Sequence, residues 1–147
     1  MQISEEFKMG IKERLGYNDE ELQVFLENPR NLEVLSKSLP LVRKTIVVEV
    51  IESHGCNSQH RVGDKFYFDG SGNLLTKLSP KKICIFALSE LDKGMSVISE
   101  LTFAGVDPNN ARFKRVGCSD VGLKCGGWGN IVMEVRVEDR EKNEDKK

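Results

Sequence analysis

Apolar side chains recur at helical spacing through the first forty residues. The first series repeats every four positions and stops before Gly16; its members are Ile3, Phe7, Ile11 and Leu15. Asn18, with Glu21 three residues later, has the pattern of a capping box and predicts the start of a second helix. A third, short helix is expected over residues 30–37, and Pro40 closes the region. We therefore expect an N-terminal helical extension over residues 1–40.

The spacing becomes alternating after Arg43, which is typical of strands. Every second position is apolar from Ile46 to Val50, and the alternation is cleaner over residues 131–137. Phe66 and Phe68 share one side of a further strand over residues 65–69, which the turn sequence of residues 69–73 follows, with residues 74–75 as a hairpin partner. Because the last strand has one polar face, the pattern favours an antiparallel sheet.

The rest of the chain predicts helix beside this sheet. Ser79 and Pro80 are typical of a helix start, and Gly94 is expected to interrupt the helix before a second stretch that runs to Phe103. Residues 112–117 are expected to form another strand. The predicted fold class is therefore α+β, with a small antiparallel sheet of about four strands and one or two helices over residues 41–138. The charged tail, residues 139–147, is expected to be disordered.

Composition and charge argue against several classes of function. The 147 residues are 39% apolar and 31% charged, with a net charge of −1, so no overall field attracts nucleic acid or an anionic membrane. No apolar run approaches the roughly 18 residues that a membrane helix needs. The polar first ten residues lack the apolar stretch of a signal peptide. We expect a cytoplasmic protein, in which cysteines stay reduced.

Cysteines and histidines are concentrated in three loops. Cys56 and His60 follow the first strand, Cys118 follows the strand of residues 112–117, and Cys125 precedes the last strand. If the first and last strands pair antiparallel, these loops lie side by side. Three thiolates and one imidazole are a ligand set that zinc accepts, and iron or an iron–sulfur cluster is the alternative. The same cysteines are also compatible with an ordinary core role.

Cys84 is a further ligand candidate. It is expected on the apolar face of the helix that starts at Ser79, which favours burial in the core. If that helix end points toward the loops, Cys84 replaces Cys125 as the fourth ligand. A thiol-dependent enzyme, with one cysteine of lowered pKa, is a separate hypothesis.

Three polar residues beside the candidate ligands are the candidates for acid–base catalysis. Asp64 and Asp120 could orient a ligating histidine or act as general bases, and His54 lies two positions before Cys56. An ordinary backbone cap is the more common role for Asp64, and a solvated loop position for His54. Trp128, among glycines, suits a pocket wall or a partner contact.

From Cys56 onward the chain resembles a family of small, functionally unassigned prokaryotic proteins that are often met in anaerobes. The resemblance rests on the pattern Cys56-x3-His60-x2-Gly63-Asp64, on Cys84 after an isoleucine, and on Cys118-x-Asp120, where Ser119 stands in place of a frequent proline. It covers roughly residues 43–138. The resemblance implies that the cysteines and His60 form a site and gives Cys84 more weight as a ligand, but it supplies no activity.

The sequence thus predicts a small metal- or iron–sulfur-binding module. Such a module could carry out redox chemistry or serve as an accessory protein of a larger enzyme. The alternative is an accessory protein without metal, which docks a larger enzyme subunit or a second copy through its N-terminal helices. The apolar residues available for that contact are Leu22, Phe25, Leu26, Leu32 and Leu35.

Overall fold

The computed structural model describes residues 3–140 and divides the chain into two compact units, Met1–Lys37 and Ser38–Lys147. The predicted disordered tail lies outside the described residues from position 141 onward. Asp139, the first residue of that predicted tail, is instead the last residue of a strand and pairs with Lys44. No helix among the described residues is long and apolar enough to cross a membrane.

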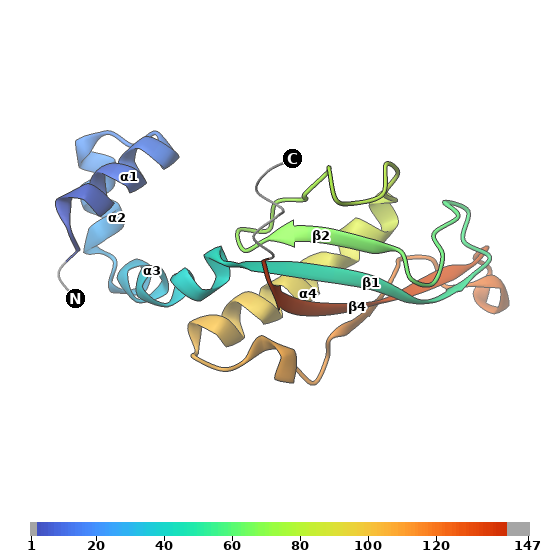
Figure 1. Cartoon of the computed structure of the whole chain (residues 1–147). Coiled ribbons are helices and arrows are strands. Elements are labelled where there is room, and N and C mark those ends of the chain that lie inside the picture. Colours follow the sequence, from blue (N-terminus) through green and yellow to red (C-terminus); the bar gives the residue numbers. More distant parts are fainter. Residues whose placement is uncertain (1–2, 141–147) are drawn as a thin grey trace. The chain divides into compact units, whose positions relative to one another are not determined.

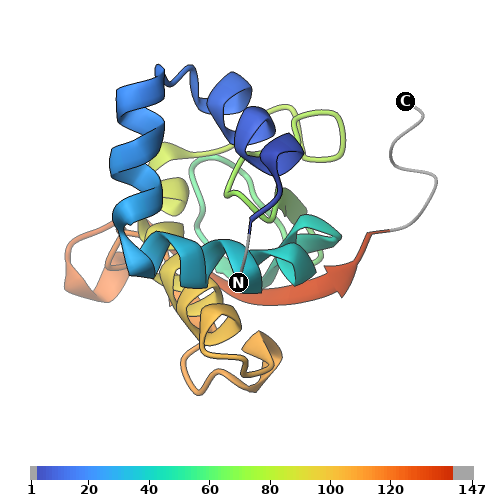
Figure 2. The ribbon, with the colours of Figure 1, turned by 90° about the vertical axis from the view of Figure 1, so that its left-hand side faces the viewer.

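The first unit contains the two expected helices, α1 (Glu5–Leu15) and α2 (Asp19–Glu27), joined by a tight turn (Figure 2). Gly16 ends α1 in the left-handed conformation, at φ 71°, which glycine adopts without steric cost. The capping box is confirmed: the Asn18 side chain accepts the Glu21 N–H at 2.9 Å, and the Glu21 carboxylate accepts the Asn18 N–H at 2.8 Å.

The third helix, α3 (Pro29–Val42), is longer than predicted and includes Pro40. The boundary between the two units falls within it, after Lys37. Pro40 lies in the last turn, where it removes one helical hydrogen bond, and burial of its neighbour Leu41 in the core of the second unit offsets that loss.

The second unit is built on an antiparallel sheet of four strands, in the order β2-β1-β4-β3 (Figure 1). The strands are β1 (Lys44–His54), β2 (Lys65–Asp69), β3 (Arg115–Gly117) and β4 (Asn130–Asp139). The predicted pairing of the first and last strands is confirmed, with Val48 opposite Val135. At the far end His54 pairs with Asn130, so the loop that leaves β1 lies beside the loop that enters β4. The strand predicted over residues 112–117 is shorter, and Leu74 makes a single bridge to Phe68.

One helix, α4 (Ile85–Phe103), lies along one face of this sheet (Figure 1). Its buried residues Ala87, Leu91 and Ile98 join the core with the apolar side chains of β1, β2 and β4. The sequence prediction of a break at Gly94 is wrong, because Gly94 lies inside the helix. A Cβ there would stand 3.0 Å from Val135 Cγ2, so this glycine lets the helix approach the sheet closely.

The predicted start of this helix at Ser79 is also wrong. The Ser79 hydroxyl accepts the N–H of Tyr67 in β2 at 3.0 Å instead of capping a helix. The chain continues without helical structure until Cys84, which is the N-cap of α4. Cys84 therefore stands at the N-terminus of the helix, where the N–H groups of the first turn favour negative charge on its sulfur.

Candidate functional site

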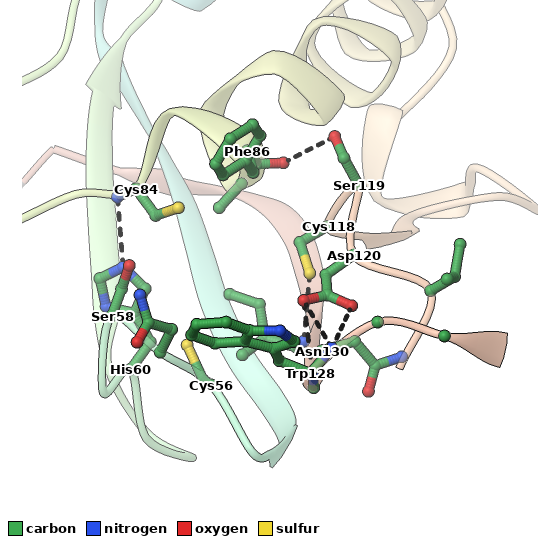
Figure 3. A pocket seen from close by; sticks show the side chains of 17 residues that line it. Cys56, Ser58, His60, Cys84, Phe86, Cys118, Ser119, Asp120, Trp128 and Asn130 are labelled. Atoms are coloured by element: carbon green, nitrogen blue, oxygen red, sulfur yellow. Dashed lines mark hydrogen bonds between the residues drawn. The ribbon is translucent and has the colours of Figure 1, made fainter. Parts of the chain in front are cut away.

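Three cysteines from distant parts of the sequence line one pocket of about 500 Å³ (Figure 3). Cys56 follows β1, Cys84 caps α4, and Cys118 follows β3. All three are half-buried free thiols that pack against the edge of the hydrophobic core. The buried side chain of His60 also lines the pocket, as predicted from its spacing to Cys56. The structure thus brings together four of the five predicted ligand residues.

The Cys56 segment is a tight turn that buries His60. The N–H of Gln59 donates to the carbonyl of Cys56 at 3.0 Å, and Gln59 adopts a left-handed backbone with φ 61°. The Ser53 hydroxyl then donates to the His60 carbonyl at 2.6 Å, which ties the turn back to β1. His60 is only 4% exposed, and its ring meets Phe66 edge-on at a centroid distance of 5.2 Å.

His60 is bonded to the backbone of Cys84. Its Nε2 accepts the Cys84 N–H at 3.3 Å, so we assign the proton of the neutral ring to Nδ1, which lies 3.8 Å from a carboxylate oxygen of Asp64. Burial lowers the pKa of His60; Asp64 opposes this shift and the charge of Lys82 adds to it. In this arrangement Nε2 is occupied, and His60 acts as a positioning residue for Cys84.

The Cys84 thiol lies beside hydrogen-bond donors that lower its pKa. The Ser58 hydroxyl lowers the pKa of Cys84 by hydrogen bonding, and burial acts against this shift. The backbone N–H groups of Phe86 and Ala87, in the first turn of α4, lower the pKa further. The thiolate form of Cys84 is therefore stabilised relative to that of an ordinary cysteine.

Cys118 is fixed by reciprocal bonds to the beginning of β4. Its N–H donates to the Ile131 carbonyl at 3.1 Å, and its Sγ accepts the Ile131 N–H at 3.4 Å. The next residue, Ser119, ties this segment to α4, because its N–H and its hydroxyl both donate to the Phe86 carbonyl, at 3.1 and 3.2 Å. Backbone-directed bonds thus hold the Cys84 and Cys118 segments together.

The Asp120 carboxylate organises the loop that closes the pocket. It accepts the N–H groups of Gly122 at 2.9 Å, Trp128 at 3.2 Å and Gly129 at 3.4 Å. These bonds, with that of Gly122 first, hold the pKa of Asp120 below its ordinary value against the effect of desolvation. The fit is close, since a Cβ on Gly127 would stand 2.0 Å from the Asp120 carboxylate. The ionised Asp120 carboxylate therefore holds the loop together, and its oxygens already accept backbone N–H groups. This arrangement does not support a general-base role.

The same loop touches the Cys56 segment through two glycines. A Cβ on Gly129 would stand 2.2 Å from the His54 carbonyl oxygen, and a Cβ on Gly55 would stand 2.7 Å from the Trp128 carbonyl oxygen. Only glycine permits this approach of two backbones. The loop before β4 and the Cys56 segment are therefore in direct backbone contact.

Three of the predicted site residues lie outside the pocket lining. Cys125 is the last residue of a short 3-10 helix (Leu123–Cys125), and its side chain is exposed. The chain turns at Gly126, with φ 90°, and the residues from Gly126 onward line the pocket, whereas Cys125 does not. His54 is exposed at the end of β1, and Asp64 accepts the N–H of Arg61 at 2.9 Å as a turn cap.

The sequence reading missed Phe86 and Ser58. Phe86 is 60% exposed and Trp128 is 72% exposed, and their rings stand on opposite sides of the space into which Cys84 and Cys118 point (Figure 3). The available signal was the position of Phe86 two residues after Cys84, which the wrong helix start concealed.

The chemistry of this pocket is that of grouped thiols. Among the described residues, no three His, Cys, Asp or Glu side chains are placed as they would be round one metal ion. The three sulfurs nevertheless share a pocket with N–H and hydroxyl donors directed at two of them, an environment that stabilises thiolates. The pocket therefore holds three free thiols of distant sequence origin beside hydrogen-bond donors.

Comparisons with known proteins supply no further assignment. No family model, no curated protein and no solved structure matches the chain. The resemblance given above therefore stays a prediction, and the function has to be argued from the pocket.

Proposed function

We propose that the pocket binds an iron–sulfur cluster through the thiolates of Cys56, Cys84 and Cys118. The observation that carries the proposal is the convergence of these three thiols, from three separate segments, on one pocket. Thiolate ligands favour zinc, copper(I) and iron–sulfur centres over harder ions. The N–H groups and the Ser58 hydroxyl that face two of the sulfurs are the hydrogen-bond donors that stabilise such ligands.

We favour a cluster over a single ion because the thiols share one pocket without being grouped round one ion. Thiolates on one zinc ion lie at about 2.3 Å from it, and hence within roughly 4 Å of each other. The cysteines line a pocket of about 500 Å³ and are not grouped for one ion. A cluster places several iron and sulfide atoms between its thiolates, so it spans a wider separation. Zinc bound after a local contraction of the loops is the competing outcome of the test.

The test is metal and sulfide analysis of tag-free protein purified without oxygen, together with its visible spectrum. Iron and inorganic sulfide in equal amounts, with a thiolate-to-iron charge-transfer band, would support the cluster. Cys56→Ser, Cys84→Ser and Cys118→Ser should each lose the band, whereas the matched control Cys125→Ser should keep it. Zinc without sulfide would replace the cluster by a single ion, and protein without any metal would refute the proposal.

Thiol catalysis at Cys84 is a second candidate. It is favoured by the position of this residue as N-cap of α4, beside the Ser58 hydroxyl, an arrangement known to activate cysteine nucleophiles. This candidate requires that Cys84 reacts in the native protein while no metal is bound. Metal-free protein with rapid, single-site alkylation at Cys84 would favour it.

The N-terminal unit supports an accessory role beside either chemistry. It is compact by itself, and its exposed apolar side chains include Val24, at 69%, and Leu15, at 49%. The residues expected to form the docking face are instead half-buried; they are Leu22, Phe25, Leu26, Leu32 and Leu35. Exposed apolar surface of this kind suits docking to a larger enzyme or to a second copy of the chain. We propose a cytoplasmic location on the same chemical ground, because reduced thiols are needed for both functions.

A further inference from the structure

The two outer edges of the sheet differ in how their backbone groups are bonded. On β2, the N–H of Tyr67 donates to the Ser79 hydroxyl at 3.0 Å, and the Tyr67 carbonyl accepts the N–H of Leu75 at 2.8 Å. The N–H of Asp69 donates to the Asn73 carbonyl at 2.9 Å. The segment after β2 therefore occupies that edge of the sheet, and β3 forms the other edge.

The β3 edge presents backbone groups without partners. The N–H of Cys118 donates to the Ile131 carbonyl at 3.1 Å, and the Lys114 carbonyl accepts another N–H of β4 at 2.8 Å. Because inward and outward groups alternate along an antiparallel strand, the N–H and carbonyl groups of Arg115 and Gly117 point away from β4. In the described part of the chain these outward groups form no backbone hydrogen bond, and both residues are exposed.

This open edge has a fixed limit at each end. Before it, the edge of β4 is covered by the Asn109 side chain, which accepts the Val137 N–H at 2.8 Å and donates to the Val137 carbonyl at 2.9 Å. After it, the N–H of Ser119 donates to the Phe86 carbonyl of α4 at 3.1 Å. The open edge thus runs along residues 113–117, which can pair with a strand of about five residues.

A groove of about 270 Å³ lies between this edge and α4. Gly94 and Val97 of α4 line one side of it, and Phe113, Val116 and Gly117 line the other. Val97 is 37% exposed and Phe113 is 72% exposed, so apolar surface flanks the open edge. An extended segment paired with β3 would direct alternate side chains into the groove, as in strand addition to a sheet edge. None of these residues lines the cysteine pocket.

The charges beside the groove are mainly positive. Lys93 and Arg115, which line it, are each paired with one glutamate, at 2.5 and 3.1 Å. The Arg112 guanidinium lies 4.7 Å from the centre of the Phe113 ring, and Lys114 Nζ donates to a backbone carbonyl at 3.5 Å; neither has a carboxylate partner among the described residues. These cations favour carboxylates on the incoming segment. They disfavour a second copy of the chain, because self-pairing along β3 would bring like charges together.

We propose that the β3 edge binds an extended acidic segment of a partner protein, which adds a strand to the sheet and turns apolar side chains into the groove beside α4. Main-chain hydrogen bonds to Arg115 and Gly117 hold the segment, and its carboxylates lie near Arg112 and Lys114. The proposal does not depend on the chemistry of the cysteine pocket.

The probe is a synthetic peptide in which glutamate and valine alternate over about seven residues, and the control peptide has lysine in place of each glutamate. An NMR titration of isotope-labelled protein should shift the amides of Arg115 and Gly117 in a saturable way with the glutamate peptide. The lysine peptide should bind at least about tenfold more weakly at low salt, because several surface ion pairs of ordinary strength add up to that difference. Added salt should reduce this preference.

Two substitutions at Gly117 separate main-chain pairing from the other contacts. Gly117→Pro removes the outward N–H and leaves the bonds between β3 and β4, so it should weaken binding of the glutamate peptide about five- to tenfold. The matched control Gly117→Ala should keep the native affinity, because a Cβ there meets only the Ile131 carbonyl oxygen, at 3.9 Å. A separate double variant, Arg112→Ala with Lys114→Ala, should lose most of the preference for the glutamate peptide.

Three results would overturn the proposal. The first is equal affinity of the native protein for the two peptides, and the second is equal affinity of Gly117→Pro and Gly117→Ala for the glutamate peptide. The third is a dimer in analytical ultracentrifugation that Gly117→Pro dissociates, which would assign the edge to a second copy of the chain.

Discussion

The backbone N–H of Cys84 donates to Nε2 of His60 at 3.3 Å, and this bond joins the start of α4 to the turn that carries Cys56. The buried His60 therefore positions Cys84 through its backbone. A histidine that ligated the metal through Nε2 would have to give up this bond. A positioning role and a metal-ligand role for His60 thus predict different effects of its replacement.

Replacement of His60 tests its positioning role. His60→Ala should lower the free energy of unfolding by about 2–4 kcal/mol, because it leaves a cavity and an unpaired N–H. His60→Gln, which offers an acceptor of similar reach, should recover part of this loss in urea unfolding followed by circular dichroism. Both variants, reconstituted with iron and sulfide, should keep the charge-transfer band of the native protein. A shifted band in His60→Gln would instead identify His60 as a ligand.

The lowered pKa of Cys84 predicts how its reactivity depends on pH in metal-free protein. The thiolate is the reactive form, and its fraction rises with pH through the pKa. Since hydrogen bonding from Ser58 and the first turn of α4 lowers that pKa, alkylation of Cys84 should reach its plateau at a lower pH than that of an ordinary thiol. Ser58→Ala should move the midpoint upward. The measurement is mass-resolved alkylation with iodoacetamide over a pH series, and an unchanged midpoint in Ser58→Ala would contradict this account of Cys84.

Removal of the Asp120 carboxylate should release the loop that bears Trp128. Asp120→Ala deletes the acceptor of three backbone N–H groups, so the amides of Gly122, Trp128 and Gly129 should exchange with solvent about tenfold faster or more. Asp120→Asn retains one oxygen and should give an intermediate rate. Hydrogen exchange read by NMR resolves these amides. Exchange rates that stay at the native values in Asp120→Ala would show that other contacts hold the loop.

The division of the chain within α3 predicts where it tolerates truncation. Deletion of residues 1–37 should leave the sheet and α4 folded, because the second unit has its own core. Deletion of residues 1–42 also removes Leu41, which is 4% exposed in that core, and should cost about 2–4 kcal/mol. Thermal and urea unfolding of both truncated chains measures the difference. Loss of folding in the shorter deletion would mean that the first unit is required for the second, and would weaken its proposed accessory role.

Local patterns were sufficient to predict the sheet and part of the site. The alternation of β1 and β4 defines their buried faces, and antiparallel pairing then places the Cys56 loop beside the loop before β4. Cys56 and His60 follow from that pairing, and Cys118 was included because it lies seven residues before Cys125. The capping box at Asn18 was likewise recognisable, because both of its partners lie within four residues.

Contacts between residues distant in sequence determine the features that local patterns predicted wrongly. Ser79 and Pro80 have the pattern of a helix start, yet the Ser79 hydroxyl accepts the N–H of Tyr67 in β2. The helix begins later, with Cys84 as its N-cap. Gly94 has the pattern of a helix break, but a glycine is needed there because Val135 packs closely against the helix. Cys125 lies in the expected loop, and the left-handed turn at Gly126 excludes it from the pocket. Each outcome depends on a neighbour that is remote in sequence.

The most direct test of the central claim counts reactive thiols in native protein before and after metal removal. Protein purified without oxygen is alkylated, digested and analysed by mass spectrometry, and a second sample is first treated with a chelator. With the proposed centre in place, only Cys125 should be labelled rapidly, and removal of the metal should expose Cys56, Cys84 and Cys118 together. Labelling of all four cysteines at rates that the chelator does not change would contradict a metal centre held by these three thiolates.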